Sequence, residues 1–258
     1  MSLIACSLLL ALPALCMGQA GPPYLSNDPG VPGSQNWEIN LALAPTLTRN
    51  TSLLQAPSID VNYGVGDDVQ LTAEIPYVIQ STSGAPQASG WGNGLPGIKW
   101  RFLNQGEEGW QAAVFPQVET SASTLAQQHG IAGPGPRYLL PVEVEKRLGT
   151  LDVDLEVGEY LPAHGAHERI LGLVAGRSVN EHLELDTEIF DDRADGALPQ
   201  QTTFDIGGRY TLHPGVIAMF MAGHTLGIEE RGPPAFFGYF GIQILLSDNG
   251  RRLNSNPP

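Results

Sequence analysis

Hydrophobic and polar side chains alternate almost without exception along residues 58–79. Successive residues of a β-strand point to opposite faces of a sheet, so this segment has one apolar face and one polar face. A short turn at residues 64–68, rich in glycine and aspartate, joins its two halves, and the whole predicts an antiparallel hairpin. The apolar positions are Ile59, Val61, Tyr63, Val69, Leu71, Ala73, Ile75 and Tyr77, and the polar positions are Asp60, Asn62, Gln70, Thr72 and Glu74.

Other segments of the chain predict further strands, most of them with the same alternation. Tight turns and longer loops rich in Gly, Pro, Ser or Gln connect them in turn, and with the hairpin they make 12 predicted strands. An even number of strands with short connections at one end and long connections at the other is typical of bacterial outer-membrane barrels, with both termini in the periplasm. The expected strands outside the hairpin lie at residues 37–48, 98–102, 110–119, 138–145, 151–157, 169–177 (whose faces the pattern does not assign), 183–189, 204–212, 216–226 and 236–246.

We therefore predict an all-β fold, a single closed antiparallel up-and-down transmembrane β-barrel of about 12 strands. Aromatic residues on the apolar parity favour this fold, because they gather near the predicted strand ends, where amphipathic rings meet lipid headgroups. A soluble β-sandwich shows the same alternation and is the alternative. The expected lipid-interface aromatics are Trp37, Tyr63, Trp100, Phe102, Trp110 and Tyr210 near short turns or the amino-terminal side, and Tyr77, Tyr138 and Phe204 near long loops.

The first 20 residues carry no charged side chain and end on small residues at Gly18 and Ala20. They predict a secretory signal peptide cleaved after Ala20, with an amino-terminal membrane anchor as the alternative. Residues 21–36 are interrupted throughout by proline and glycine, which predicts an irregular periplasmic lead-in. The barrel is expected at residues 37–246 and a disordered polar tail at residues 247–258.

Composition narrows the possible functions. Both cysteines, Cys6 and Cys16, lie in the predicted signal peptide, which excludes a disulfide scaffold, a thiolate metal site and a cysteine nucleophile from the mature chain. The formal net charge of −14 disfavours binding to nucleic acid, because phosphate backbones repel an acidic chain. We expect no cofactor and no metal, and the expected partners are outer-membrane lipid and a small-molecule solute.

The polar parity of the predicted strands carries many more acids than bases. In a barrel this parity faces the lumen, where crowded carboxylates concentrate cations and repel anions, so we expect a passive, weakly cation-selective channel. A narrow interior filled by charged pairs that serve only stability is the alternative, since twelve strands lie between filled and open barrels. The expected lumen-lining residues are the acids Asp60, Glu74, Glu143, Glu145, Asp152, Asp154, Glu156, Glu184, Asp186, Glu188 and Asp205 and the bases Lys99, Arg101 and Arg209.

Several stretches resemble an outer-membrane barrel family named for the meta-cleavage pathway of phenol degradation, whose members are described as transporters. The resemblance implies a barrel that conducts small solutes, with an association with aromatic catabolism, and it implies no catalytic residue. The stretches are G-P-P-Y-L-S-N-D-P-G from Gly21, W-E-I-N-L-A from Trp37, I-D-V-N-Y-G-V-G-D-D-V-Q-L-T-A-E-I-P-Y from Ile59, and G-I-K-W-R-F-L from Gly97.

Enzyme chemistry has weaker support. His164 and His167 lie close together in a predicted loop, and residues 191–196 are rich in aspartate but lack the spacing of a calcium loop. A hydrolase at the barrel rim would use His164, His167, Asp191 and Asp192. No nucleophile elbow and no phosphate-binding loop occurs in the sequence. A solute channel, a rim hydrolase and a structural or adhesive barrel remain the three hypotheses.

Overall fold

The computed structural model describes residues 21–106, 109–133, 135–163, 166–195, 200–226 and 235–247. The predicted signal peptide, His164 and all of the predicted tail beyond Ser247 lie outside the described residues. Among the described residues, no helix is long and apolar enough to cross a membrane.

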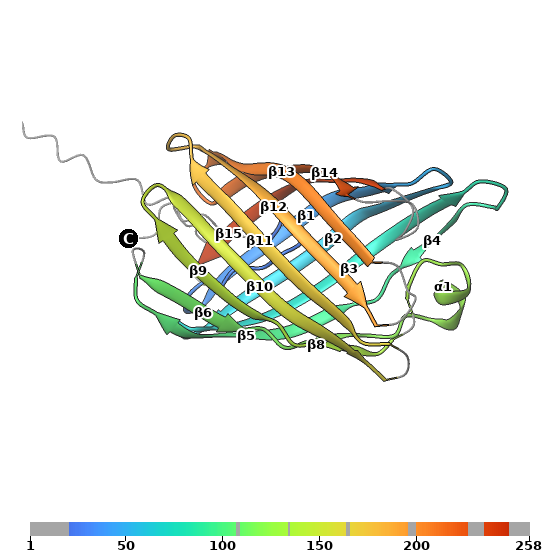
Figure 1. Cartoon of the computed structure of the whole chain (residues 1–258), viewed down its shortest axis with the longest axis horizontal. Helices are drawn as coiled ribbons and strands as arrows, with labels where there is room; N and C mark the ends of the chain where they lie inside the picture. Colours follow the sequence, from blue (N-terminus) through green and yellow to red (C-terminus); the bar gives the residue numbers. More distant parts are fainter. Residues whose placement is uncertain are drawn as a thin grey trace, which may run out of the picture.

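The chain forms a closed antiparallel barrel of 12 strands (Figure 1), which confirms the predicted fold class and overturns the sandwich alternative. Pairing of β1 with β15 closes the sheet on itself, with Trp37 opposite Leu246 and Leu47 opposite Phe236. The elements are β1 Asn36–Leu47, β2 Thr51–Val65, β3 Val69–Thr82, β4 Ala88–Trp91, β5 Leu95–Asn104, β6 Trp110–Val114, β7 Gln117–Glu119, α1 Thr124–Gln128, β8 Arg137–Leu139, β9 Val142–Leu148, β10 Leu151–Pro162, β11 Glu168–Ser178, β12 Leu183–Ala194, β13 Gln200–His213, β14 Val216–Leu226 and β15 Phe236–Ser247.

Three barrel strands are interrupted, which is why fifteen segments make twelve strands. Pro116 separates β6 from β7 and Pro141 separates β9 from β8, because proline has no N–H to donate to the neighbouring strand. Residues 92–94, with two glycines, separate β4 from β5, and both pieces pair with β3.

The two ends of the barrel differ. One end, here called the turn end, holds the start of β1 and the short β2–β3, β9–β10 and β13–β14 turns. The opposite end, here called the loop end, holds the longer connections, including the segment with α1 between β7 and β8 (Figure 1). Ser123 caps α1 by accepting a hydrogen bond from the Ala126 N–H at 3.2 Å.

The α1 segment folds against the inner side of the extended β2–β4 strands. Ala126 and Ile131 form an apolar cluster with Val78, whose side chain lies on the same face of β3 as the lumenal Gln70. Leu53 of β2 packs against the same cluster. The loop between β7 and β8 therefore lies at the inner side of the loop end of the barrel.

Exposed aliphatic and aromatic side chains cover the outer face, and polar side chains dominate the inner face. On β10, for example, Leu155 and Val157 are exposed while Asp154 and Glu156 are buried. The structure also assigns the faces of β11, which sequence could not: Leu171 and Leu173 point outward, and Ile170, Gly172, Val174 and Gly176 point inward.

The largest difference from expectation concerns residues 21–33, here called the inner segment. We predicted that this Pro/Gly-rich stretch precedes the barrel as a periplasmic lead-in, and this is wrong, because the segment lies inside the lumen. Tyr24, Ser26 and Asp28 are buried and contact side chains of the barrel wall. The segment leaves the lumen at the turn end, where the Gln35 N–H donates to the carbonyl oxygen of Gly64 at 2.9 Å.

Candidate solute pathway

The barrel contains a cavity of about 1430 Å³ that lies beside the inner segment. Its lining includes Glu38, near the turn end of β1, and Thr46, near the loop end of the same strand. These two residues lie within two positions of the two ends of β1, which spans Asn36–Leu47. The cavity therefore reaches from near one end of the barrel to near the other.

Two acids of the wall bind the backbone of the inner segment. The carboxylate of Glu188 accepts hydrogen bonds from the N–H groups of Leu25 at 2.9 Å and Ser26 at 2.7 Å. Glu156 accepts one from the N–H of Asn27 at 3.0 Å and one from its side-chain amide at 3.4 Å. Hydrogen bonds to a carboxylate are stronger than those between neutral groups, so these contacts hold the segment against β10 and β12.

Two bases bind carbonyl oxygens of the same segment. Lys99 donates to the carbonyl of Asp28 and forms an ion pair with Glu143 at 3.2 Å. Arg209 donates to the carbonyl of Pro22 at 2.7 Å and forms an ion pair with Glu184 at 3.2 Å. The inner segment has no regular secondary structure, so its backbone groups bond to the wall instead: acids accept from its N–H groups and bases donate to its carbonyl oxygens.

Tyr24 anchors the inner segment through an apolar cluster. Its ring packs with Val174, Met221 and Phe237, all on the inner face, and its hydroxyl donates to Asp186 at 3.0 Å. Burial, and then the charge of Asp186, raises the pKa of the Tyr24 hydroxyl, so the group keeps the proton that it donates.

The inner segment also explains two inward glycines. A Cβ built on Gly172 would lie 1.7 Å from the Oγ of Ser26, so only glycine allows the segment to approach β11. A Cβ on Gly64 would lie 1.7 Å from the carbonyl oxygen of Gly33, where the segment leaves the lumen.

The expected lumen-lining residues divide into two groups. Those that line the cavity are Asp60, Glu74, Lys99, Arg101, Glu156, Glu184 and Arg209. The remaining acids, Glu143, Glu145, Asp152, Asp154, Asp186, Glu188 and Asp205, are buried on the inner face and do not line the cavity. Part of the expected acidic lining therefore lies in a packed wall.

On the cavity wall opposite these buried acids, neutral side chains donate hydrogen bonds to two carboxylates. Asp60 accepts hydrogen bonds from Asn40 at 2.9 Å, Asn62 at 2.9 Å and Thr72 at 3.2 Å. Glu74 accepts one from Ser58 at 3.1 Å. These contacts orient Asp60 and Glu74, and no base in the described part of the chain forms an ion pair with either carboxylate.

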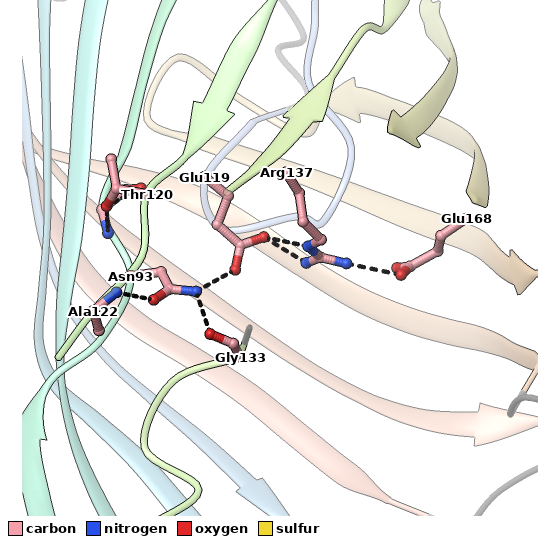
Figure 2. A network of polar contacts seen from close by, with 8 residues as sticks. Asn93, Glu119, Thr120, Ala122, Gly133, Arg137 and Glu168 are labelled. Carbon is pink, nitrogen blue, oxygen red and sulfur yellow. Dashed lines mark hydrogen bonds and ion pairs between the residues drawn. The ribbon is translucent and has the colours of Figure 1, made fainter. Parts of the chain in front are cut away.

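At the loop end, a second network ties together the strand ends and the α1 segment (Figure 2). Arg137 donates to Glu119 at 2.7 Å and to Glu168 at 2.8 Å, and its guanidinium lies 4.3 Å from the centre of the Tyr160 ring. The Asn93 side chain donates to Glu119 at 2.7 Å and to the carbonyl of Gly133 at 3.1 Å. The network connects the loop after β7 to the wall at β4–β5 and β11.

The expected interface aromatics have exposed or partly exposed rings. Trp100, Phe102, Trp110, Tyr138, Phe204, Tyr210 and Trp37 are exposed, and Tyr63 and Tyr77 are partly exposed. Trp37 packs on Tyr63 with ring centres 4.5 Å apart at the turn end, and Tyr77 packs edge-on to Trp91 at 5.3 Å towards the loop end. Trp91 joins this group although its short strand was not predicted.

Of the residues of the hypothetical rim hydrolase, His167, Asp191 and Asp192 lie in the described part of the chain, and contacts with other residues hold two of them. Asp191 and Asp192 are neighbours on β12 and point to opposite faces, and Asp191 binds Arg193 at 2.5 Å and Thr202 at 2.7 Å. His167 contacts Glu159 at 3.0 Å. Within the described part of the chain, no group of three or more His, Cys, Asp or Glu residues is placed to hold a metal ion.

Sequence patterns missed the charged and aromatic residues of the inner segment, above all Tyr24 and Asp28, and the network at Arg137. One signal for the segment was present. Gly172 lies in the interior of β11, and a glycine within a strand often marks a site that another backbone approaches closely.

The sequence matches no protein-family model and no curated protein. Solved structures do share the fold. An outer-membrane channel from Pseudomonas putida F1 aligns with a TM-score of 0.66 and 15% identity over 86% of this chain and 100% of that chain. The NanC porin aligns with a TM-score of 0.58 and 9% identity over 80% of this chain and 98% of that chain. The translocator domain of the autotransporter NalP from Neisseria meningitidis aligns with a TM-score of 0.54 and 10% identity over 82% of this chain and 89% of that chain.

The chain has the fold of outer-membrane barrels. At these identities the similarity extends to the fold and not to a substrate, and the neighbours include a translocator domain as well as channels. The resemblance to the family named for phenol degradation stays a prediction, as does the signal peptide.

Proposed function

We propose that the protein is a passive channel of the outer membrane for small cationic or neutral solutes, aromatic compounds among them. The observation that carries the proposal is the cavity of about 1430 Å³ that follows β1 from near the turn end to near the loop end. Channels among the proteins of the same fold support it. Outer-membrane barrels have short turns on the periplasmic side, so in this proposal the turn end faces the periplasm and the loop end faces the cell exterior.

Charge along the cavity supports a preference for cations. The acids that line it outnumber the bases, and Asp60 and Glu74 are held by neutral groups. Lys99 and Arg209, in contrast, form ion pairs with Glu143 and Glu184. Carboxylates inside a low-dielectric wall attract cations along a water path. The acids of the lining are Asp28, Glu38, Asp60, Asp67, Glu74, Glu156, Glu181 and Glu184, and the bases are Lys99, Arg101 and Arg209.

Planar-bilayer recording of the purified protein under a KCl gradient tests the proposal. We expect a conductance whose reversal potential favours K⁺ over Cl⁻. The double change Asp60→Asn and Glu74→Gln should lower that preference by roughly threefold, because it removes two uncompensated charges from the cavity wall. Glu159→Gln, which changes an acid outside the cavity lining, is the matched control and should leave the preference unchanged. Absence of conductance, or a preference for Cl⁻, contradicts the proposal.

A structural barrel is the second candidate, and one observation favours it. The inner segment and the buried acids fill part of the interior, so on that side the lumen is packed and its contacts can serve stability alone. Purified protein that is folded in bilayers and carries no current would support this alternative.

A further inference from the structure

On several strands the inner wall carries acidic or polar side chains nearer the turn end and apolar side chains nearer the loop end. On β12, Glu184, Asp186 and Glu188 come nearest the turn end, and Phe190 follows towards the loop end. On β10, Asp152, Asp154 and Glu156 precede Tyr160 in the same direction. This order is independent of strand tilt, because it is read along each strand separately.

Three further positions around the barrel repeat this order, whereas β13 keeps Thr203 on its inner face towards the loop end and β14 places Met221 before Thr225. Gln111 precedes Phe115 between β6 and β7, Glu145 and Glu143 precede Leu139 across β9 and β8, and Gln243 precedes Tyr239 on β15. The apolar side chains towards the loop end on these strands and on β11 form one part of the inner wall, here called the apolar belt. Its members that line the cavity include Phe115, Leu139, Tyr160, Ile170, Phe190 and Tyr239.

The apolar belt is unusual for the inside of a barrel that conducts ions alone. The interior of water-filled barrels is polar. Apolar side chains that line water keep an unfavourable hydration free energy that a bound apolar group would relieve. The belt lies between the charged network at Arg137 and the acid-rich zone, so it is bounded by polar groups on both sides. Ligand sites have this composition, with an apolar lining and a few placed polar groups.

An unpartnered polar group within the belt points to a ligand. Gln117 is 5% exposed and lines the cavity, and its Nε2 has no hydrogen-bond partner among the described residues. A buried amide without a partner costs free energy unless a bound molecule or water satisfies it. Uncompensated carboxylates, Asp60 and Glu74, line the same cavity.

We propose that the cavity selects small amphipathic organic cations, molecules with an aromatic or aliphatic ring and an ammonium group. The ring binds in the apolar belt at Phe190 and Tyr239, and the ammonium group binds the carboxylates beyond it. The carboxylates complement the charge of the ammonium group, and the apolar belt complements the ring. This inference rests on the proposed channel function and names the substrate class of the same pathway.

Block of the K⁺ current in planar bilayers tests the inference with three probes of matched size or charge. Benzylammonium carries both the ring and the charge, methylammonium lacks the ring, and benzoate carries the ring with the opposite charge. We expect benzylammonium to halve the current at a concentration about tenfold lower than methylammonium, because part of the ring's apolar surface leaves water. Benzoate should not reduce the current in this range.

Two variants test whether the stronger block by benzylammonium depends on the apolar belt. Phe190→Ala should reduce the ratio between benzylammonium and methylammonium to about threefold or less, since it removes one ring of the belt. Phe204→Ala, on the neighbouring strand with its ring exposed on the outer face, is the control and should leave the ratio unchanged. Tyr239→Ser provides a second belt variant if Phe190→Ala does not fold.

The outcomes separate the inference from the function on which it rests. Equal block by benzylammonium and methylammonium, with K⁺ conductance intact, overturns the inference and leaves the channel. Equal effects of Phe190→Ala and Phe204→Ala also overturn it, because the ring then binds outside the belt. Absence of any K⁺ conductance overturns both.

Discussion

The carboxylate of Glu188 is the contact whose loss should most directly release the inner segment. It accepts two backbone hydrogen bonds, from Leu25 at 2.9 Å and from Ser26 at 2.7 Å, and the side chain is fully buried. In Glu188→Gln one oxygen becomes an NH₂ group that faces a backbone N–H, so one of the two bonds is lost. A hydrogen bond to a charged group contributes about 1.5–3 kcal/mol, so we expect the bound state of the segment to lose about 2 kcal/mol.

Amide hydrogen exchange of the intact protein measures this change. A loss of about 2 kcal/mol corresponds to about 30-fold more frequent release of the segment, and exchange at the Leu25 and Ser26 amides should accelerate by the same factor. Glu74→Gln is the matched control, since Glu74 also faces the lumen but binds Ser58. Acceleration below about threefold in Glu188→Gln, or an equal acceleration in Glu74→Gln, would refute the assignment of Glu188 as the main anchor.

Two further predictions concern the contacts of the segment and of the loop end. Gly172→Ala should accelerate exchange in the inner segment at least as much as Glu188→Gln, because the new Cβ would lie 1.7 Å from the Ser26 Oγ, whereas Leu171→Ala on the outer face should not. Arg137→Ala should increase thermolysin cleavage in the α1 loop by roughly threefold, since it removes partly exposed ion pairs that contribute up to about 1 kcal/mol. Arg137→Lys should restore little of this protection, because lysine lacks the planar fork that contacts two acids, and unchanged cleavage in both variants would contradict a role for the network.

The barrel itself could be predicted from sequence because its determinants are local. Alternation such as that of residues 58–79 or 151–157 sets which side chains face out, and each predicted strand corresponds to a barrel strand in the structure. The breaks at Pro116 and Pro141 follow from the missing N–H of proline. None of these features requires knowledge of distant contacts.

The interior could not be predicted to the same extent, because its contacts join residues far apart in the chain. Tyr24 binds Asp186, and Ser26 binds Glu188, across more than 160 positions. A Pro/Gly-rich segment has no periodic pattern that could reveal this partner. Alternation along the strands predicts that Glu188 and Asp60 both lie on the inner face. It does not predict that Glu188 is buried against the inner segment while Asp60 lines the cavity.

The position of the inner segment next to β1 has a consequence for assembly. The segment precedes β1 in the chain, but its anchors lie on β5, β10, β12 and β13, and β1 completes the cylinder by pairing with β15. Its complete binding surface therefore exists only when these strands are in place, and without the segment Glu188 and Glu156 would lose the backbone donors of Leu25, Ser26 and Asn27. We therefore expect the inner segment to become ordered only after the strands that bind it.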